Sequence, residues 1–290
     1  MLFGAHVSGG VAGGVARGAE LGCDAIQVFT QSPRTWRHPE HDPALLARVR
    51  EERDGAGLGA LVCHALYLCN LASPDAEIHA KSVAALEATL RTARAIGAEA
   101  VVLHLGSHLG SGLEVAFERV VPALRTLLAL TDDRLWLLLE NSAGAGGTLG
   151  RSVDELGLLV DALDRHPRLG VCLDSCHWFV SGVDVTRPRV LDAALADVEA
   201  RIGLDRLRCL HVNDAATALG SNRDRHASLG AGTMGEGLGT FLAHPAFQGL
   251  PAILETPGPD GHGPDAGEVR RLREMHARGL ARARRRRARR

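Results

Sequence analysis

Short apolar runs alternate with longer amphipathic stretches along almost the whole chain. The runs are rich in Val, Ile and Leu, and the stretches between them repeat their apolar residues with helical spacing. The runs lie at residues 2–6, 25–29, 60–64, 100–104, 135–140, 169–174, 207–212 and 251–255. Helical spacing is clearest at 81–96, 114–129, 152–165 and 189–202. Strands that alternate with helices indicate parallel βαβ construction, so the pattern predicts an α/β fold, a single (β/α)8 TIM barrel.

An open, doubly wound sheet could be assembled from similar pieces. The glycine-rich segment after the first run, HVSGGVAGG, however, lacks the G-x-G-x-x-G order of a dinucleotide site. A chain of 290 residues with 46% hydrophobic content can bury one large core, so we expect one barrel domain over residues 1–280. No apolar run reaches the roughly 20 residues of a membrane span. We therefore expect a cytoplasmic protein with no membrane partner.

Charge and cysteine content add two expectations. The net charge of −1 conceals an asymmetry, because the last ten residues, ARARRRRARR, carry seven arginines. We expect residues 281–290 to form a disordered tail that adds non-specific phosphate contacts, or else a frayed helix end without a role in the chemistry. The six cysteines form no C-x-x-C pair, which favours free thiols in a reducing compartment, with Cys172 and Cys209 as small core residues.

Side chains that can bind metal ions stand at the ends of six apolar runs. They are His64, His104, Glu140, Asp174, His211 and Glu255. In a parallel barrel these ends share one face, the face that carries active sites. A single histidine at a strand end is more often an ordinary hydrogen-bonded residue, but six such residues at one mouth need opposite charge to offset their carboxylates. Mixed imidazole and carboxylate ligands suit zinc or manganese.

Two further groups predict an additional ion. His177 follows Asp174 by three residues in LDSCHWF, and Asp224 and His226 stand in NRDRHASLG. In an extended segment the Asp-x-His spacing places both side chains on one side. Two metal ions about 3.5–4 Å apart can activate water and bind the attacking and leaving oxygens of a phosphodiester. The pattern thus indicates hydrolysis rather than redox chemistry.

At these residues the sequence resembles the endonuclease IV family of abasic-site endonucleases, also called deoxyribonuclease IV or AP endonuclease family 2. The resemblance runs from GAHVS at residues 4–8 to ILET at 253–256. It rests on FTQSPRTW, HALYLCNLASP, HLGSHLG, LLENSAGAG, VCLDSCH, HVNDA and DRHASLGAG. It implies a base excision repair enzyme that hydrolyses the phosphodiester 5′ to abasic sites in double-stranded DNA by a three-metal mechanism. The implied products are a 3′-hydroxyl and a 5′-deoxyribose phosphate, and the implied activity includes removal of 3′-blocking groups.

The resemblance also implies roles for individual residues. His64, His104 and Glu140 would hold a first Zn²⁺, and Glu140 would bridge to a second held by Asp174, His211 and Glu255. His177, Asp224 and His226 would hold a third Zn²⁺, with Mn²⁺ a substitute in one or more sites. Glu140, Asp174 and Glu255 would be catalytic. Arg34, Tyr67 and Leu68 would bind DNA and fill the gap left by the extruded abasic nucleotide. No obligate protein partner is expected, and nucleoid association would accompany activity.

Two other functions remain open from the sequence. A metal-dependent sugar isomerase or epimerase of the same barrel superfamily also gathers carboxylates and histidines at strand ends, but it would need only one or two ions. A non-catalytic protein that binds damaged DNA could retain the fold and recruit partners through its arginine-rich end. The set formed by His177, Asp224 and His226 favours the nuclease over the sugar enzyme, and the intact ligand set argues against a non-catalytic protein.

Overall fold

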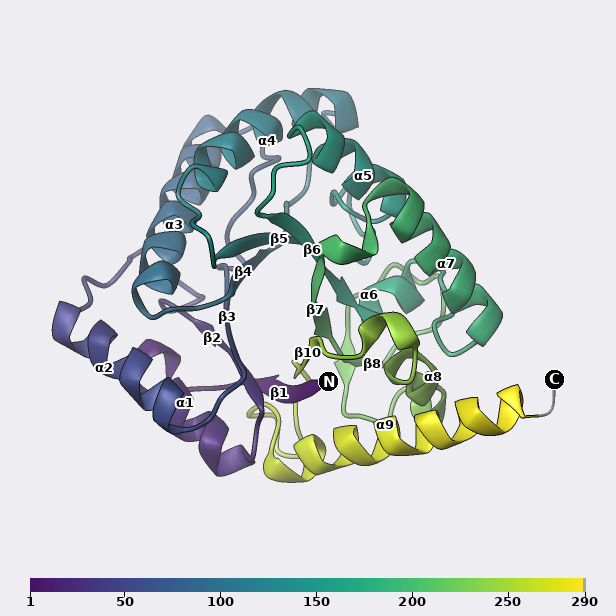
Figure 1. Cartoon of the computed structure of the whole chain (residues 1–290). Helices are drawn as coiled ribbons and strands as arrows, with labels where there is room; N and C mark the ends of the chain where they lie inside the picture. Colours follow the sequence, from purple (N-terminus) through teal and green to yellow (C-terminus); the bar gives the residue numbers. More distant parts are fainter. Residues whose placement is uncertain (289–290) are drawn as a thin grey trace.

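Eight short strands hydrogen-bond side by side into a closed parallel barrel (Figure 1). The computed structural model describes residues 1–288. The barrel strands are β1 (Leu2–His6), β2 (Ala25–Phe29), β3 (Ala60–His64), β4 (Ala100–Leu103), β5 (Trp136–Glu140), β6 (Leu169–Asp174), β7 (Leu207–His211) and β10 (Pro251–Leu254). Neighbouring strands pair in chain order, and β10 closes the ring between β7 and β1. The predicted TIM barrel is confirmed, and each strand lies within one residue of its expected bounds.

Helices surround the barrel, as Figure 1 shows. They are α1 (Gly10–Leu21), α2 (Pro43–Gly55), α3 (Ala76–Ala95), α4 (Leu113–Leu128), α5 (Val153–Ala162), α6 (Ser175–Val180), α7 (Pro188–Arg201), α8 (Gly239–Leu242) and α9 (Ala266–Arg287), with 3-10 helices η1 (Leu204–Arg206), η2 (Gly235–Leu238) and η3 (Pro245–Phe247). Several helix starts are encoded locally. Asp75 accepts hydrogen bonds from the amides of Glu77 and Ile78, and Ser152 accepts one from Glu155, so side chains satisfy the free N–H groups of α3 and α5.

The barrel strands are apolar on both faces because each face is covered. Inside the barrel lies a small core, and a larger core separates the strands from the helices. Cys172 and Cys209 fill the inner core as expected, and all six cysteines are free thiols. Gly4 allows β1 and β2 to approach closely, because a Cβ there would overlap the carbonyl oxygen of Ala25. Doubly covered parallel strands explain the nearly continuous apolar runs in the sequence.

A short antiparallel hairpin is added after the seventh barrel strand. It pairs β8 (Asp214–Ala215) with β9 (His226–Ala227). The buried carboxylate of Asp214 accepts hydrogen bonds from the backbone amides of Gly230, Gly232, Met234 and Gly235. The segment after β9 is therefore folded around the Asp214 side chain, which anchors the hairpin.

At residues 281–287 the structure shows a helix end, the alternative to the disordered tail. Helix α9 continues through Arg287, so residues 281–287 are helical rather than disordered, and Arg289 and Arg290 lie outside the described residues. Alanine and arginine are strong helix formers. Once tertiary packing holds the earlier turns of a helix, each further residue adds one hydrogen bond, so the helix extends. Among the described residues, no helix combines the length and the apolar run that a membrane span requires.

Candidate metal centre

The nine predicted ligand residues come together at the carboxyl ends of the barrel strands. His64, Glu140, Asp174 and His211 are the last residues of β3, β5, β6 and β7. His104 and Glu255 follow β4 and β10 directly. His177 lies in α6, Asp224 lies in the hairpin loop, and His226 begins β9. Asp174 also caps α6 by accepting a hydrogen bond from the amide of His177 at 2.8 Å, which places the two side chains over the same end of the barrel.

His64, His104 and Glu140 form a first cluster. Their potential ligand atoms lie within 4.8 Å of one another. The Nε2 atoms of His64 and His104 lie 3.3 and 3.4 Å from the same carboxylate oxygen, Oε2 of Glu140. Two imidazole nitrogens and one carboxylate oxygen thus point at a common position, as a shared cation would require.

Glu140, Asp174, His211 and Glu255 form a second cluster, again within 4.8 Å. Nδ1 of His211 lies 3.0 Å from Oε1 of Glu140 and 3.2 Å from Oε2 of Glu255. The two oxygens of Glu140 therefore face different clusters. This is the arrangement that a carboxylate needs to bridge two ions.

Asp174, His177, Asp224 and His226 form a third cluster. Nε2 of His177 and Nε2 of His226 each lie 3.2 Å from a different oxygen of Asp224, and Nε2 of His226 lies 3.8 Å from Oδ2 of Asp174. Both nitrogens are buried, and neither has a partner in hydrogen-bonding geometry among the described residues. Unsatisfied buried nitrogens are costly, so their presence beside a carboxylate fits a metal ion better than a direct hydrogen bond.

Second hydrogen bonds orient three of the histidine rings. Nδ1 of His64 contacts the carbonyl oxygen of Ala65 at 2.6 Å, that of His177 contacts Asn141 O at 2.9 Å, and that of His226 contacts Glu255 O at 3.2 Å. Carbonyl oxygens only accept, so each Nδ1 must carry the proton. The Nε2 lone pair of each ring is thereby directed at the clusters, as in metal-binding histidines.

The carboxylates of the candidate metal centre need positive charge beside them. Burial alone would raise the pKa of the Glu140 carboxyl, but His104, His211 and His177 hold that pKa well below its usual range. Burial would lower the pKa of His177 and of His211, yet neighbouring carboxylates raise both well above normal. For His226, burial is likewise outweighed by Asp224 and Asp174, which raise its pKa to about 9. Without cations, these imidazoles must take up protons, so the donor set fits divalent ions that replace them.

Several supporting residues were not identified from the sequence. The Asn213 amide donates to Oδ2 of Asp174 at 2.6 Å, and its oxygen accepts from the amide of Glu255 at 2.8 Å. The Asn141 side chain accepts from the Asp174 amide at 2.6 Å. Gln27 and His6 approach Glu255 from the neighbouring strands β2 and β1. The sequence did contain a signal for these three residues. Asn141 directly follows Glu140, and Asn213 lies two residues after His211. Gln27 interrupts the apolar run AIQVF.

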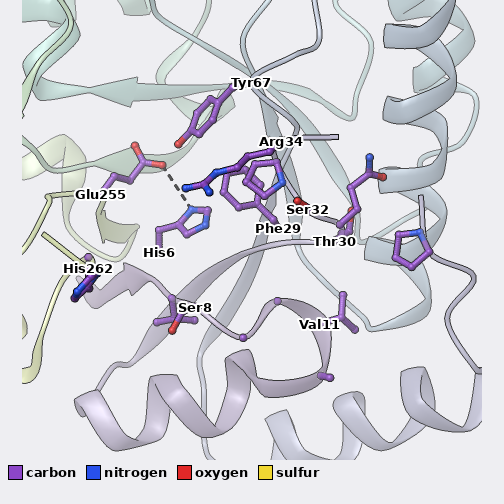
Figure 2. Close-up of a pocket in the computed structure, with 18 of the residues that line it drawn as sticks. His6, Ser8, Val11, Phe29, Thr30, Ser32, Arg34, Tyr67, Glu255 and His262 are labelled. Atoms are coloured by element: carbon purple, nitrogen blue, oxygen red, sulfur yellow. Dashed lines mark ion pairs between the residues drawn. The ribbon is translucent and has the colours of Figure 1, made fainter. Parts of the chain in front are cut away.

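The three residues expected to bind DNA lie at the rim of the barrel mouth. Tyr67 is 61% exposed, Leu68 is 37% exposed, and Arg34 is also exposed. The Tyr67 ring stands 5.4 Å from the ring of His64. Figure 2 shows Tyr67, Arg34, His6 and Glu255 around one cavity, which has a volume of about 730 Å³.

Tyr67 also borders two other cavities. One of about 560 Å³ is lined by Leu68, His104 and His177, and one of about 320 Å³ by His104, His226 and Glu255. An exposed aromatic side chain therefore stands beside the candidate metal centre, among cavities that open around it.

Comparisons with known proteins find relatives over nearly the whole chain. Residues 15–278 match the family of xylose isomerase-like TIM barrels. A protein named "Probable endonuclease 4" from Methanoculleus marisnigri is 42% identical, over 95% of this chain and 99% of its own length. A protein of the same name from Halothermothrix orenii is 37% identical, with 94% and 99% covered.

Solved structures give the same result. Endonuclease IV from Thermus thermophilus superposes with a TM-score of 0.83 at 37% identity, covering 96% of this chain and 100% of that one. A D-tagatose 3-epimerase-like protein has a TM-score of 0.69 at 18% identity, with 97% of each chain covered, and shares the fold. With its sequence matched over nearly its full length and its barrel mouth lined by acidic and imidazole side chains, the chain belongs to the endonuclease IV family.

Proposed function

We propose that this protein is a metal-dependent endonuclease that hydrolyses the phosphodiester 5′ to abasic sites in double-stranded DNA. The products would be a 3′-hydroxyl and a 5′-deoxyribose phosphate, and 3′-blocking groups would be removed at the same site. One observation carries the proposal: three clusters of potential ligands share Glu140 and Asp174 beside the exposed Tyr67. Family membership supports a DNA repair endonuclease, and the clusters support its dependence on metal.

The residues that would hold three Zn²⁺ ions follow the three clusters, with Mn²⁺ able to replace zinc in one or more positions. His64, His104 and Glu140 would hold the first ion, and Glu140 with Asp174, His211 and Glu255 the second. His177, Asp224 and His226 would hold the third, with Asp174 within reach. When bound, such ions lower the pKa of water and neutralise charge that develops on phosphate oxygens.

The protein's own groups would prepare the centre for that chemistry. Glu140 places one oxygen toward each of two clusters, and Asp174 and Glu255 are oriented by Asn213. These three carboxylates are the proposed catalytic residues because all three belong to the second cluster, where they would hold the ion that acts on the phosphate. Four carboxylates and five imidazoles lie close together, so the centre would bind cations strongly. Bound ions would make the electrostatic potential at the barrel mouth positive toward DNA.

The rim residues would recognise the damaged duplex. Tyr67 and Leu68 present exposed apolar surface that can stack against bases left without a partner, and Arg34 presents a guanidinium that can bind phosphate. An abasic nucleotide is the least costly to extrude, because it has no base to unpair or unstack. The rim would therefore select abasic DNA over intact DNA.

A sugar epimerase is the main alternative, because epimerases share the fold. Two observations favour the nuclease: the third cluster, which a one-ion or two-ion sugar enzyme would not need, and the exposed apolar rim. A non-catalytic damage-binding protein would have no use for a complete ligand set. The three functions predict different metal content and different reactions.

The decisive experiment uses a duplex with one tetrahydrofuran abasic analogue, which resists lyase chemistry but not phosphate hydrolysis. We expect incision 5′ to the analogue, loss of incision with a chelator, and three zinc ions per chain by elemental analysis. Glu140→Gln should lower incision by more than about 100-fold, since residues that merely support metal ligands contribute about 10–100-fold.

Glu155→Gln is the matched control, because Glu155 is a largely buried glutamate that contacts no potential metal ligand. It should cut like the parent protein. Near-normal turnover by metal-replete Glu140→Gln would contradict the bridging role. One ion per chain with sugar epimerisation would establish the alternative enzyme, and tight binding without incision would establish the non-catalytic protein.

A further inference from the structure

One histidine of the candidate metal centre is oriented differently from the others. His64, His177 and His226 are held through Nδ1 by backbone carbonyl oxygens and direct Nε2 at the clusters. His211 is reversed: its Nδ1 faces Glu140 and Glu255, and its Nε2 faces a side chain, that of Gln27, at 2.9 Å. The orientation of His211 therefore depends on a group that a single substitution can remove.

Gln27 is fully buried inside the barrel on β2, and each polar group of its amide has a partner. Its Nε2 lies 2.6 Å from Oε1 of Glu255 and 3.0 Å from Nδ1 of His6. A carboxylate can only accept, so the amide nitrogen must face Glu255 and the amide oxygen must face His211. Hydrogen-bonding chemistry thus fixes the orientation of the Gln27 amide.

Fixing the amide also fixes the proton on His211. Because Oε1 of Gln27 is an acceptor, Nε2 of His211 must carry a proton and donate it. Nδ1 is then the nitrogen with a lone pair available to a metal ion, on the side where Glu140 and Glu255 supply oxygens at 3.0 and 3.2 Å. The same amide holds Oε1 of Glu255, so one residue aligns two members of the second cluster.

The second amide hydrogen extends this alignment to the cavity wall. It is directed at Nδ1 of His6, whose ring lines the cavity of Figure 2 beside Glu255 and Arg34. His6 therefore accepts a hydrogen bond from Gln27 at Nδ1, and the other edge of its ring faces away from Gln27. Both amide hydrogens of Gln27 are thus engaged by protein groups, which is what a fixed internal support requires.

We propose that Gln27 is a positioning residue for the metal centre, which sets the proton position on His211 and the orientation of Glu255 so that both can bind the ion of the second cluster. The inference rests on the proposed metal dependence. Gln27 contacts no reacting atom in this role and acts only through the two ligands.

The test compares Gln27→Met with the parent protein in zinc-buffered solutions. Methionine has a similar length and volume but cannot form these hydrogen bonds, so the packing of the barrel is retained. We expect Gln27→Met to bind its weakest zinc ion about 10–100-fold less tightly, the range typical of residues that support metal ligands. The zinc concentration for half-maximal incision should rise by a similar factor, and excess zinc should restore activity. Cobalt-substituted protein should show an altered visible spectrum.

Gln31→Met is the matched control, because Gln31 is also buried and follows β2 but contacts His38 rather than a ligand. Its zinc affinity should be unchanged. Gln27→Asn, which keeps the amide but is one methylene shorter, provides a second variant if the methionine protein does not fold, and it should also bind zinc weakly. Parental zinc affinity and an unshifted half-maximal zinc concentration in a folded Gln27 variant would overturn the inference. A parent protein that binds no zinc would instead refute the proposed function.

Discussion

At the scale of single residues, the candidate metal centre holds imidazole nitrogens that could take up either protons or metal ions. Five imidazoles and four carboxylates lie close together there, and most of them are buried. The carboxylates raise the pKa of His226 to about 9 although burial acts in the opposite direction. A group with a raised pKa stabilises the fold fully below its unfolded pKa, and this contribution is lost as the pH rises through its folded pKa.

The first prediction concerns the metal-free protein. For His226 the relevant window runs from 6.5 to about 9, so chelator-treated protein should lose stability across this range. The loss attributable to His226 is on the order of 3 kcal/mol, at about 1.4 kcal/mol for each pKa unit. Urea unfolding at several pH values measures it, and His226→Gln should flatten the profile. With zinc bound, stability should instead fall at acidic pH, because protons displace the ion.

The second prediction concerns Tyr67, whose ring is exposed at the rim. Tyr67→Ala should weaken binding to the tetrahydrofuran duplex by about 1–3 kcal/mol, the range found when an aromatic side chain that stacks on a base is removed. Fluorescence anisotropy with zinc present, in the slow-cutting Glu140→Gln background, measures this. Leu158→Ala, which removes another exposed apolar side chain on α5, should leave binding unchanged. Equal affinities for the Tyr67 variant and the parent would show that the ring is ordinary loop packing.

At the scale of elements, the barrel is held closed by contacts between the two ends of the chain. Arg273 on α9 forms a two-pronged ion pair with Asp24, with N–O distances of 2.8 and 2.9 Å. Oδ2 of Asp24 also accepts from the amide of Phe3 on β1 at 3.0 Å. Burial alone would raise the pKa of Asp24, but Arg273 and the Phe3 amide lower it. The last helix is thereby tied to the first two strands.

The third prediction follows from that closure. Asp24→Ala should lower the free energy of unfolding by about 2 kcal/mol, because it leaves the Phe3 amide and the Arg273 guanidinium without their acceptor. Glu20→Ala is the control: it removes an exposed i,i+3 ion pair with Arg17 and should change stability by at most about 0.5 kcal/mol. Chemical denaturation of both variants tests the difference. Equal effects would show that the Asp24 contact does not secure the closure.

At the scale of the whole molecule, positive charge is concentrated at the end of α9. Arg284, Arg285 and Arg286 are exposed, and none of them forms an ion pair within the described part of the chain. Arg282 and Arg278, about one and two turns earlier, are instead paired with Glu236. This end of the helix lies beyond residue 278, where the family match stops.

The fourth prediction tests whether this basic end contributes to DNA binding. Replacing Arg284, Arg285 and Arg286 by Gln should reduce the salt dependence of binding to undamaged duplex, with a change in slope of about 0.9 for each phosphate that the helix end no longer neutralises. A triple Gln variant at Arg48, Arg91 and Arg94, which are exposed and paired with acidic residues, controls for net charge. The same salt dependence in both variants would identify the basic end as a solvated helix terminus without a role in binding.

Much of this protein was determined by its sequence. The strand and helix positions followed from apolar periodicity, because parallel strands covered on both faces need unbroken apolar runs. The positions of the candidate ligands followed from polar residues at the ends of those runs, because barrel topology brings all such ends to one face. Of the two expectations for the C-terminal end, the disordered tail is wrong for residues 281–287, because helix propensity and the packing of the earlier turns of α9 prevailed over the high charge.

Tertiary structure alone decided how the ligand residues share their partners. Periodicity could place Glu140 at the mouth, but only the fold shows its two oxygens facing different clusters. Gln27, Asn141 and Asn213 look like incidental polar residues in the sequence, since their partners are 33 to 228 positions away along the chain. Hydrogen bonds are short-ranged and directional, so these roles exist only once distant strands have been brought into register around one axis.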